Sequence, residues 1–247
     1  LEEAVGAGAF GFGTSQTMFH RSSDGQLTPT LAATEEEYAG LAGALGRAGS
    51  GVLQFVIEYH DDWEQLLDMG LRQASAAGRP FSMSLVQSHG KPQLWRTILD
   101  KIDAANDAGT SATTQVLPRP LGVLLGLELT LHPFYSTPTY LAMADRSLAE
   151  RVNELRKPEV KERILAEAND PNPTIAIGMR VRDFDQLYEM GPDFDYEPAA
   201  DDSIRAQAER LGVSPESLAY DKLLEREGRN VLYLAFSNYA DHSLEPS

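Results

Sequence analysis

The sequence predicts an α/β fold built on a parallel sheet. The main sign is a helical pattern that ends in Ala-Gly and is followed at once by a short strand, at Gly49, Gly78 and Gly109. These stops lie 29 and 31 residues apart. Glycine just past a helix adopts the left-handed conformation that closes the last turn. Strands that alternate with helices at this period are typical of a parallel sheet, because parallel neighbours need a crossover that a helix supplies.

Composition excludes several classes of protein. The 247 residues carry 21 Lys and Arg against 37 Asp and Glu, a net charge of −16, which disfavours nucleic-acid binding. The chain has no cysteine, so disulfides and thiolate nucleophiles are excluded. The longest apolar run, Leu121 to Leu131, is about half of the roughly 20 residues that a membrane helix needs. No basic leader precedes an apolar core at the N-terminus, so we expect no signal peptide, no membrane partner and a cytoplasmic location.

The first 120 residues contain the repeated βα units. Thr34 with Glu37 three residues later forms a capping-box pattern before one helix, and Pro92 suits the first turn of another. A third helix follows from the spacing of apolar residues after Asp62. The expected strands are Ala9 to Thr14, Val52 to Glu58, Phe81 to Gln87 and Ser111 to Leu117.

Two closures of this sheet fit the pattern, an open doubly wound sheet and a (β/α)8 barrel. Both place ligands at the carboxyl ends of the strands. After Pro120 the rhythm is lost, so we assign residues 1–120 to βα units, 121–200 to an insertion and 201–247 to a return to the barrel. The insertion carries two charged helices near 147–156 and 158–169. The last part carries helices near 201–211 and 214–227 and one strand at 231–236.

The five or six strands expected in all fall short of the eight that a barrel requires. An incomplete barrel is therefore favoured over a complete open sheet, and a self-contained open α/β sheet that binds a small ligand is the third interpretation.

Candidate binding residues follow the expected strands. His20, Arg21 and Asp24 come directly after the first strand, where an imidazole, a guanidinium and a carboxylate could converge on an anion or a carbonyl. The alternative is a solvated turn in which Arg21 pairs with Asp24. His60 and His89 lie just beyond two later strands, where barrel hydrolases collect metal ligands. For His60, a place beside acidic helix caps is the favoured interpretation.

Five strings, in this order, resemble the N-acyl-D-amino-acid deacylases, the D-aminoacylase-like enzymes of the amidohydrolase superfamily. They are Gly8-Ala9-Phe10-Gly11-Phe12-Gly13-Thr14-Ser15, His20-Arg21-Ser22-Ser23-Asp24-Gly25, Arg119-Pro120-Leu121-Gly122-Val123-Leu124-Leu125-Gly126-Leu127-Glu128, Asp195-Tyr196-Glu197-Pro198 and Asn238-Tyr239-Ala240-Asp241. Together they run over nearly the whole chain. The resemblance implies part of a metal-dependent (β/α)8 TIM barrel with an inserted helical and irregular segment, flanked in the family by a small β-sandwich.

The resemblance also implies zinc, which activates water to attack an amide carbonyl. The family's HxH motif belongs before Leu1 and its acid-base aspartate motif after Ser247, so the catalytic residues are expected outside this chain. His89 is the expected metal ligand, and the segment Gln54 to Ile57 holds no histidine where the family has one. The family's bridging Cys or Lys ligand has no counterpart either. Ser15, His20, Arg21 and Asp24 are the expected substrate-binding residues.

The sequence therefore predicts an amidohydrolase that cleaves N-acyl-D-amino acids or related amides, with this chain inactive alone. The alternative is a metal-free binding or scaffolding module derived from the barrel. Exposed strand edges of an incomplete barrel pair readily with another chain, so we expect a homo-oligomer or aggregation.

Overall fold

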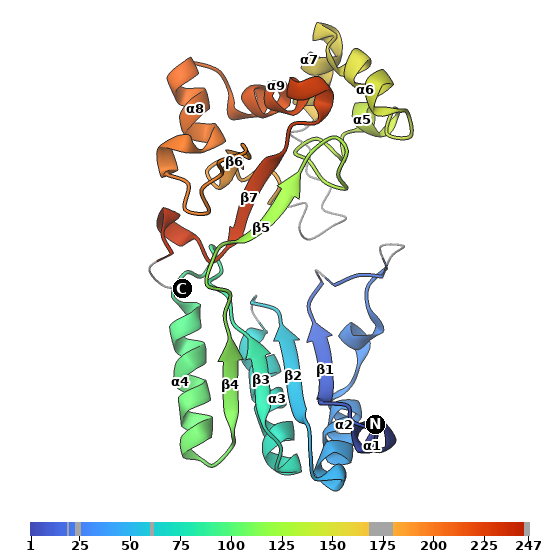
Figure 1. Ribbon diagram of the computed structural model, residues 1–247, viewed down its shortest axis with the longest axis vertical. Helices are drawn as coiled ribbons and strands as arrows, with labels where there is room; N and C mark the ends of the chain where they lie inside the picture. Colours follow the sequence, from blue (N-terminus) through green and yellow to red (C-terminus); the bar gives the residue numbers. More distant parts are fainter. Residues whose placement is uncertain (19, 23–25, 60–61, 168–179, 245–247) are drawn as a thin grey trace. The chain divides into compact units, whose positions relative to one another are not determined.

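The computed structural model describes residues 1–18, 20–22, 26–59, 62–167 and 180–244, and it divides the chain into two compact units. Unit 1 comprises Leu1–Leu117 and unit 2 comprises Pro118–Ser247. Each unit has its own sheet and its own hydrophobic core. Figure 1 shows the helices and strands of both units.

Unit 1 contains, in its described part, a four-stranded parallel sheet in the order β1-β2-β3-β4. Its helices and strands are α1 (Glu2–Gly6), β1 (Gly11–Gln16), α2 (Glu35–Ala48), β2 (Val52–Ile57), α3 (Trp63–Ala77), β3 (Phe81–Ser84), α4 (Leu94–Asp107) and β4 (Ala112–Gln115). Thr34 caps α2 by accepting a hydrogen bond from the Glu37 amide, as the capping pattern predicts. Gly49 and Gly78 end α2 and α3 in the left-handed conformation, which confirms two of the three predicted helix stops. At the third, the C-cap of α4 is Ala108, and Gly109 follows it with a φ of 94°.

The helices of unit 1 pack on one face of the sheet, and Figure 1 shows α2 and α3 behind the strands. Leu53, Phe55 and Ile57 of β2 are buried on that face, while Val52, Gln54 and Val56 between them are more exposed. Registered neighbours on β3 and β4 join the same core, together with side chains from the three long helices. That core comprises Phe81, Met83, Ala112, Tyr38, Ala42, Leu45, Leu67, Ala74, Ile98 and Ile102.

The opposite face carries a row of small and polar side chains. Together with Phe10, Val52 and Pro80, they line a hollow of about 550 Å³. The row runs across the four strands, because the register pairs each of its residues with the next: Gly13, Gln54, Ser82 and Thr113. When parallel strands are added in sequence order and every crossover is right-handed, all connecting helices lie on one side of the sheet. In a doubly wound sheet the strand order reverses partway, so helices cover both sides. The α/β class and the parallel sheet are confirmed; the described residues form no closed barrel.

All four strands of unit 1 differ from their predicted limits. β2 ends one residue early, at Ile57, and β4 is shorter than predicted at both ends, running from Ala112 to Gln115. β1 begins two residues later than expected, because Gly11 is the first residue paired with β2. β3 ends at Ser84 instead of running to Gln87. The cause is the Tyr59 hydroxyl, which donates to the Ser84 carbonyl at 2.6 Å and accepts from the Val86 amide at 3.2 Å, the two backbone groups that would have continued the ladder.

Unit 2 holds an antiparallel sheet of three strands in its described part, in the order β5-β7-β6. These are β5 (Leu121–Leu125), β6 (Leu187–Glu189) and β7 (Leu232–Ser237). The strand expected at 231–236 is present as β7, but it pairs in this second sheet and not with the parallel strands. β6 lies in a stretch where no strand was expected, because three residues are too few to show a period of two.

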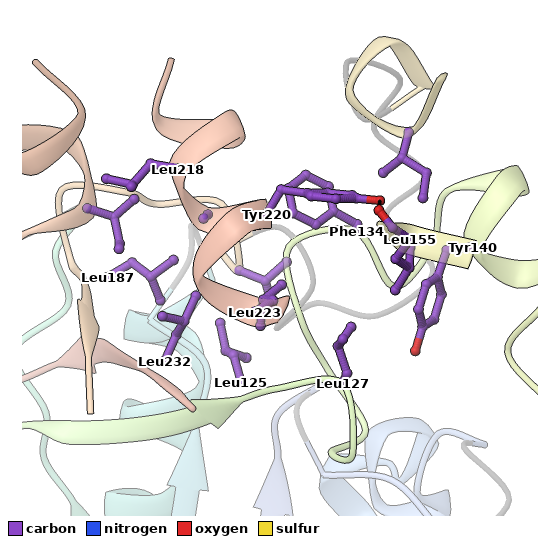
Figure 2. Close-up of a cluster of buried hydrophobic side chains, with 14 of the residues drawn as sticks. Leu125, Leu127, Phe134, Tyr140, Leu155, Leu187, Leu218, Tyr220, Leu223 and Leu232 are labelled. Carbon is purple, nitrogen blue, oxygen red and sulfur yellow. Dashed lines mark hydrogen bonds between the residues drawn. The ribbon is translucent and has the colours of Figure 1, made fainter. Parts of the chain in front are cut away.

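Helices cover one face of this sheet: α5 (Pro138–Leu141), α6 (Leu148–Leu155), α7 (Pro158–Glu167), α8 (Ile204–Leu211) and α9 (Pro215–Gly228). Figure 2 shows side chains of α9, among them Leu218 and Leu223, in the same apolar cluster as Leu125, Leu187 and Leu232 of the strands. Ser147 and Glu150 form a capping box that starts α6. Among the described residues, no helix is long and apolar enough to cross a membrane.

Candidate functional site

The described members of the expected substrate-binding set lie at or just after the carboxyl end of β1. Ser15 lies within β1, and its hydroxyl accepts a hydrogen bond from the Thr17 amide at 3.4 Å. His20 is exposed, and Arg21 is partly buried and forms an antiparallel bridge with Leu27. Asp24, like His60, lies outside the described residues.

His89 is partly buried and follows β3, in a short turn where Ser88 bridges Lys91. Because the strands are parallel, the carboxyl ends of β1 and β3 lie at the same edge of the sheet with only β2 between them. Neighbouring strands are about 5 Å apart, so the two ends are separated by about 10 Å. The topology thus brings the predicted β1 loop and His89 to one edge, where ligands of parallel α/β sheets bind.

Glu58 stands at the same edge, at the end of β2, and is buried. Its Oε1 accepts a hydrogen bond from the Met18 amide at 2.7 Å and another from the Thr17 hydroxyl. A buried carboxylate needs such donors to offset its desolvation. Glu58 therefore fixes the start of the loop that carries His20 and Arg21. Sequence reasoning placed it at a strand end but gave it no role, since only the fold brings Thr17 and Met18 to it.

Tyr59 separates the ends of β2 and β3. Its hydroxyl occupies the place of a backbone partner at Ser84 and Val86, and burial raises the pKa of Tyr59 to about 12, so the hydroxyl keeps its proton and remains a donor. The separation of the ends of β2 and β3 therefore depends on the hydroxyl of Tyr59 alone.

Tyr59→Phe is expected to destabilise unit 1 by about 1 to 3 kcal/mol, because both backbone groups lose their partner in a poorly solvated place. Both tryptophans, Trp63 and Trp95, lie in unit 1, so urea unfolding followed by tryptophan fluorescence reports on this unit. Tyr135→Phe in unit 2 is the control and should leave that transition unchanged. A Tyr59→Phe curve that coincides with the parent curve would show that the hydroxyl does not hold the strand ends.

The residues at this edge do not by themselves fit a zinc ion. Within the described ranges, no three His, Asp or Glu side chains stand together as a group able to hold a metal. Glu58 is already engaged by Thr17 and Met18, and zinc sites in proteins need at least three side-chain ligands. His89 alone is therefore no metal site.

The remaining described histidines lie in unit 2 and have structural partners. The Nδ1 of His132 accepts a hydrogen bond from the Phe134 amide at 3.2 Å in a buried pocket. The Nδ1 of His242 lies 2.7 Å from the Tyr188 hydroxyl.

No protein-family model and no curated protein matches the sequence. Among solved structures, the chain is similar to an N-acyl-D-glutamate deacylase from Bordetella bronchiseptica, complexed with zinc and a phosphonate inhibitor that mimics the tetrahedral intermediate of the reaction, at 16% identity and a TM-score of 0.47. It is also similar to a D-aminoacylase with a binuclear metal center, at 16% identity and a TM-score of 0.41.

These structures come from the enzymes that the five sequence strings resemble. The chain is covered over 98% and 96% of its length, but it spans only 37% of the deacylase chain and 36% of the D-aminoacylase chain. At this identity and these TM-scores, no residue role or activity follows from the likeness.

Proposed function

We propose that these residues are the middle part of a hydrolase of the amidohydrolase superfamily that cleaves the amide bond of N-acyl-D-amino acids or related amides, and that the chain alone does not turn over substrate. The observation that carries the proposal is the order in which the strands and helices of unit 1 are connected. Its four parallel strands follow one another in sequence order, with all their helices on one face.

The face of the unit 1 sheet that no helix covers supports the hypothesis that the sheet is part of a barrel. Parallel sheets are found almost only with both faces covered. The helix-free face here carries a row of glycine, glutamine, serine and threonine, and its hollow of about 550 Å³, which Phe10, Val52 and Pro80 also line, is open. Further parallel strands that closed the sheet into a barrel would cover this face and pair the free edges of β1 and β4.

The edge of unit 1 then supplies part of a substrate pocket. Arg21 and His20 would bind polar groups of the substrate, with Ser15 of β1 as a further hydrogen-bond donor, and Asp24 stays a candidate from the sequence alone. Glu58 would act indirectly, by holding Thr17 and Met18 so that this loop keeps one position. His89 would approach the pocket from β3.

Zinc is part of the proposal only through the resemblance, which implies that it activates water. The described residues do not form its site, so we assign no catalytic step to this chain.

The test compares this chain with a longer gene product that contains it. The longer protein is expected to copurify with near-stoichiometric zinc and to hydrolyse N-acetyl-D-amino acids, while the 247-residue chain does neither. In the longer protein, Arg21→Gln should raise KM about tenfold or more with a smaller change in kcat, because a charged contact to bound substrate is lost. Arg47→Gln, at an exposed pair with Glu2 in α1, is the matched control.

A longer protein that binds no divalent metal and cleaves no amide would refute the proposal and favour the metal-free binding module. The strand edges give a second check, because a chain with unpaired parallel edges is expected to dimerise or aggregate. Sedimentation that shows a clean monomer at high concentration would argue against an incomplete barrel.

A further inference from the structure

Three of the five strings meet in unit 2, on the face of its sheet opposite the helices. The Arg119 guanidinium lies over the Tyr196 ring, 5.9 Å from its centroid. The Tyr239 hydroxyl donates to the Pro198 carbonyl at 2.8 Å, which ties the segment after β7 to the loop that carries Tyr196. Residues 119, 196 and 239 are far apart in the sequence, so only the fold shows that they form one cluster. The function proposed above uses none of them.

Tyr233 of β7 lies at the centre of this cluster. Its ring centroid is 4.7 Å from that of Phe194 and 6.2 Å from that of Tyr196. Gly122 of β5 makes room for the ring, because a Cβ at that position would lie 2.0 Å from a Tyr233 ring carbon. Tyr233 is only 3% exposed, and its hydroxyl has no hydrogen-bond partner among the described residues.

A buried hydroxyl without a partner costs free energy, so its presence calls for an acceptor from elsewhere. Burial raises the pKa of Tyr233 to about 12, although Arg119 acts in the opposite direction. The hydroxyl therefore keeps its proton at neutral pH and is available as a donor.

Among the residues that the structure describes, Arg119 has no anionic partner. Its guanidinium donates a long hydrogen bond, 3.4 Å, to the carbonyl of its neighbour Pro120, and it forms no ion pair with the residues that the structure describes. The carboxylates of the nearby loop are engaged elsewhere: Asp195 accepts from the Glu197 amide at 2.9 Å, and Glu197 accepts from the Leu244 amide at 3.4 Å. In this acidic chain of net charge −16, the described part thus holds an arginine without an ion pair in the same aromatic cluster as a phenol without a hydrogen-bond partner.

We propose that Arg119 and Tyr233 form a subsite for a carboxylate attached to an apolar or aromatic group. The guanidinium supplies the charge and two parallel donors, the phenol supplies a third donor, and the ring of Phe194 contacts the apolar part. The Tyr233 hydroxyl is enclosed, so the ligand displaces the Tyr196 ring, which is half exposed. Asp195 and Glu197 repel anions, which limits the site to singly charged ligands bound weakly, at about 1 to 10 mM.

The test uses benzoate with the 247-residue chain and follows backbone amide shifts by NMR. Saturable shifts are expected at Arg119, Tyr196 and Tyr233. Arg119→Gln should weaken binding about tenfold or more, and Tyr233→Phe about three- to tenfold. The matched control is Arg229→Gln, which removes an exposed arginine of the same unit that faces Glu128 at 3.6 Å and should leave binding unchanged.

Tyr233→Phe carries a second readout that separates a binding role from a structural one. Removing a hydroxyl that has no partner should raise the Tm of the ligand-free chain by about 2 to 4 °C while weakening benzoate binding. Benzoate that fails to bind the parent chain, or binds Arg119→Gln or Tyr233→Phe as tightly as the parent, overturns the proposal. Tighter binding of inorganic phosphate than of benzoate also overturns it. Benzoate has no amide bond and no metal is added, so the outcome is independent of the proposed hydrolase activity.

Discussion

Gly11→Ala is expected to destabilise unit 1 by about 3 kcal/mol or more, which for a unit of this size is a large part of its stability. A Cβ at Gly11 would lie 2.1 Å from the carbonyl oxygen of Val52 and 2.6 Å from its nitrogen. Both are backbone atoms of the neighbouring strand, so no side chain can move aside to make room. The strand pair β1-β2 must separate at its start, where the Val52 amide donates to the Phe10 carbonyl at 3.0 Å.

Tryptophan fluorescence during urea unfolding measures this effect, because Trp63 and Trp95 both belong to unit 1. Gly40→Ala is the matched control: a Cβ at this exposed position of α2 meets nothing within 4 Å. Since alanine is the better helix former, this control should stabilise unit 1 by about 0.5 to 1 kcal/mol. If both variants unfold at the parent's urea concentration, the close approach of β1 and β2 at Gly11 does not exist in solution.

His132 is expected to make unit 2 sensitive to acid. It is 1% exposed, its ring lies 4.2 Å from that of Tyr140, and its Nε2 has no partner among the described residues. Burial, with a smaller contribution from Arg151, lowers the pKa of His132 from 6.5 to about 3. Between these two pH values the unfolded chain binds a proton that the folded chain does not, so stability is lost as the pH falls.

The expected loss from this one group between pH 7 and pH 4 is about 3 kcal/mol. His132→Asn isolates it: the Asn Oδ1 can accept the Phe134 amide as the His Nδ1 does, but the side chain does not titrate. The free energy of unfolding, measured from near-ultraviolet circular dichroism of the tyrosines, should fall more steeply with acid in the parent than in the variant. Carboxylates with lowered pKa values, such as Glu150 and Glu154, contribute equally to both curves. Parallel curves would mean that His132 is solvated or already charged.

The sequence predicted the helices of unit 1 well where they carry local signals, although Pro92 lies before α4, which begins at Leu94, and not in its first turn. The Thr34 cap and the glycine stops at Gly49 and Gly78 depend on backbone chemistry within a few residues, and the structure confirms them. Strand limits were less accurate. β3 ends early because a hydroxyl from Tyr59, 25 residues before Ser84, takes the place of its ladder partner.

In the candidate site, too, some features could be predicted from the sequence and others could not. Ser15, His20, Arg21 and His89 could be named from their positions after predicted strands, and the topology brings those strand ends to one edge. The bonds from Thr17 and Met18 to Glu58, and the meeting of Arg119, Tyr196 and Tyr233, join residues far apart in the chain. No residue spacing in the sequence predicts such contacts.

By itself, the sequence determined the alternation of helices and strands, the parallel direction of the first four strands and the family that the chain resembles. These features follow from local turn chemistry and from the crossover that parallel strands require. Only the tertiary structure decided that the helices cover one face of the parallel sheet, that β7 belongs to a separate antiparallel sheet, and which polar side chains are left buried without a partner. Those features depend on which distant segments pack together, and the free energy of that packing is not contained in any short stretch of the chain.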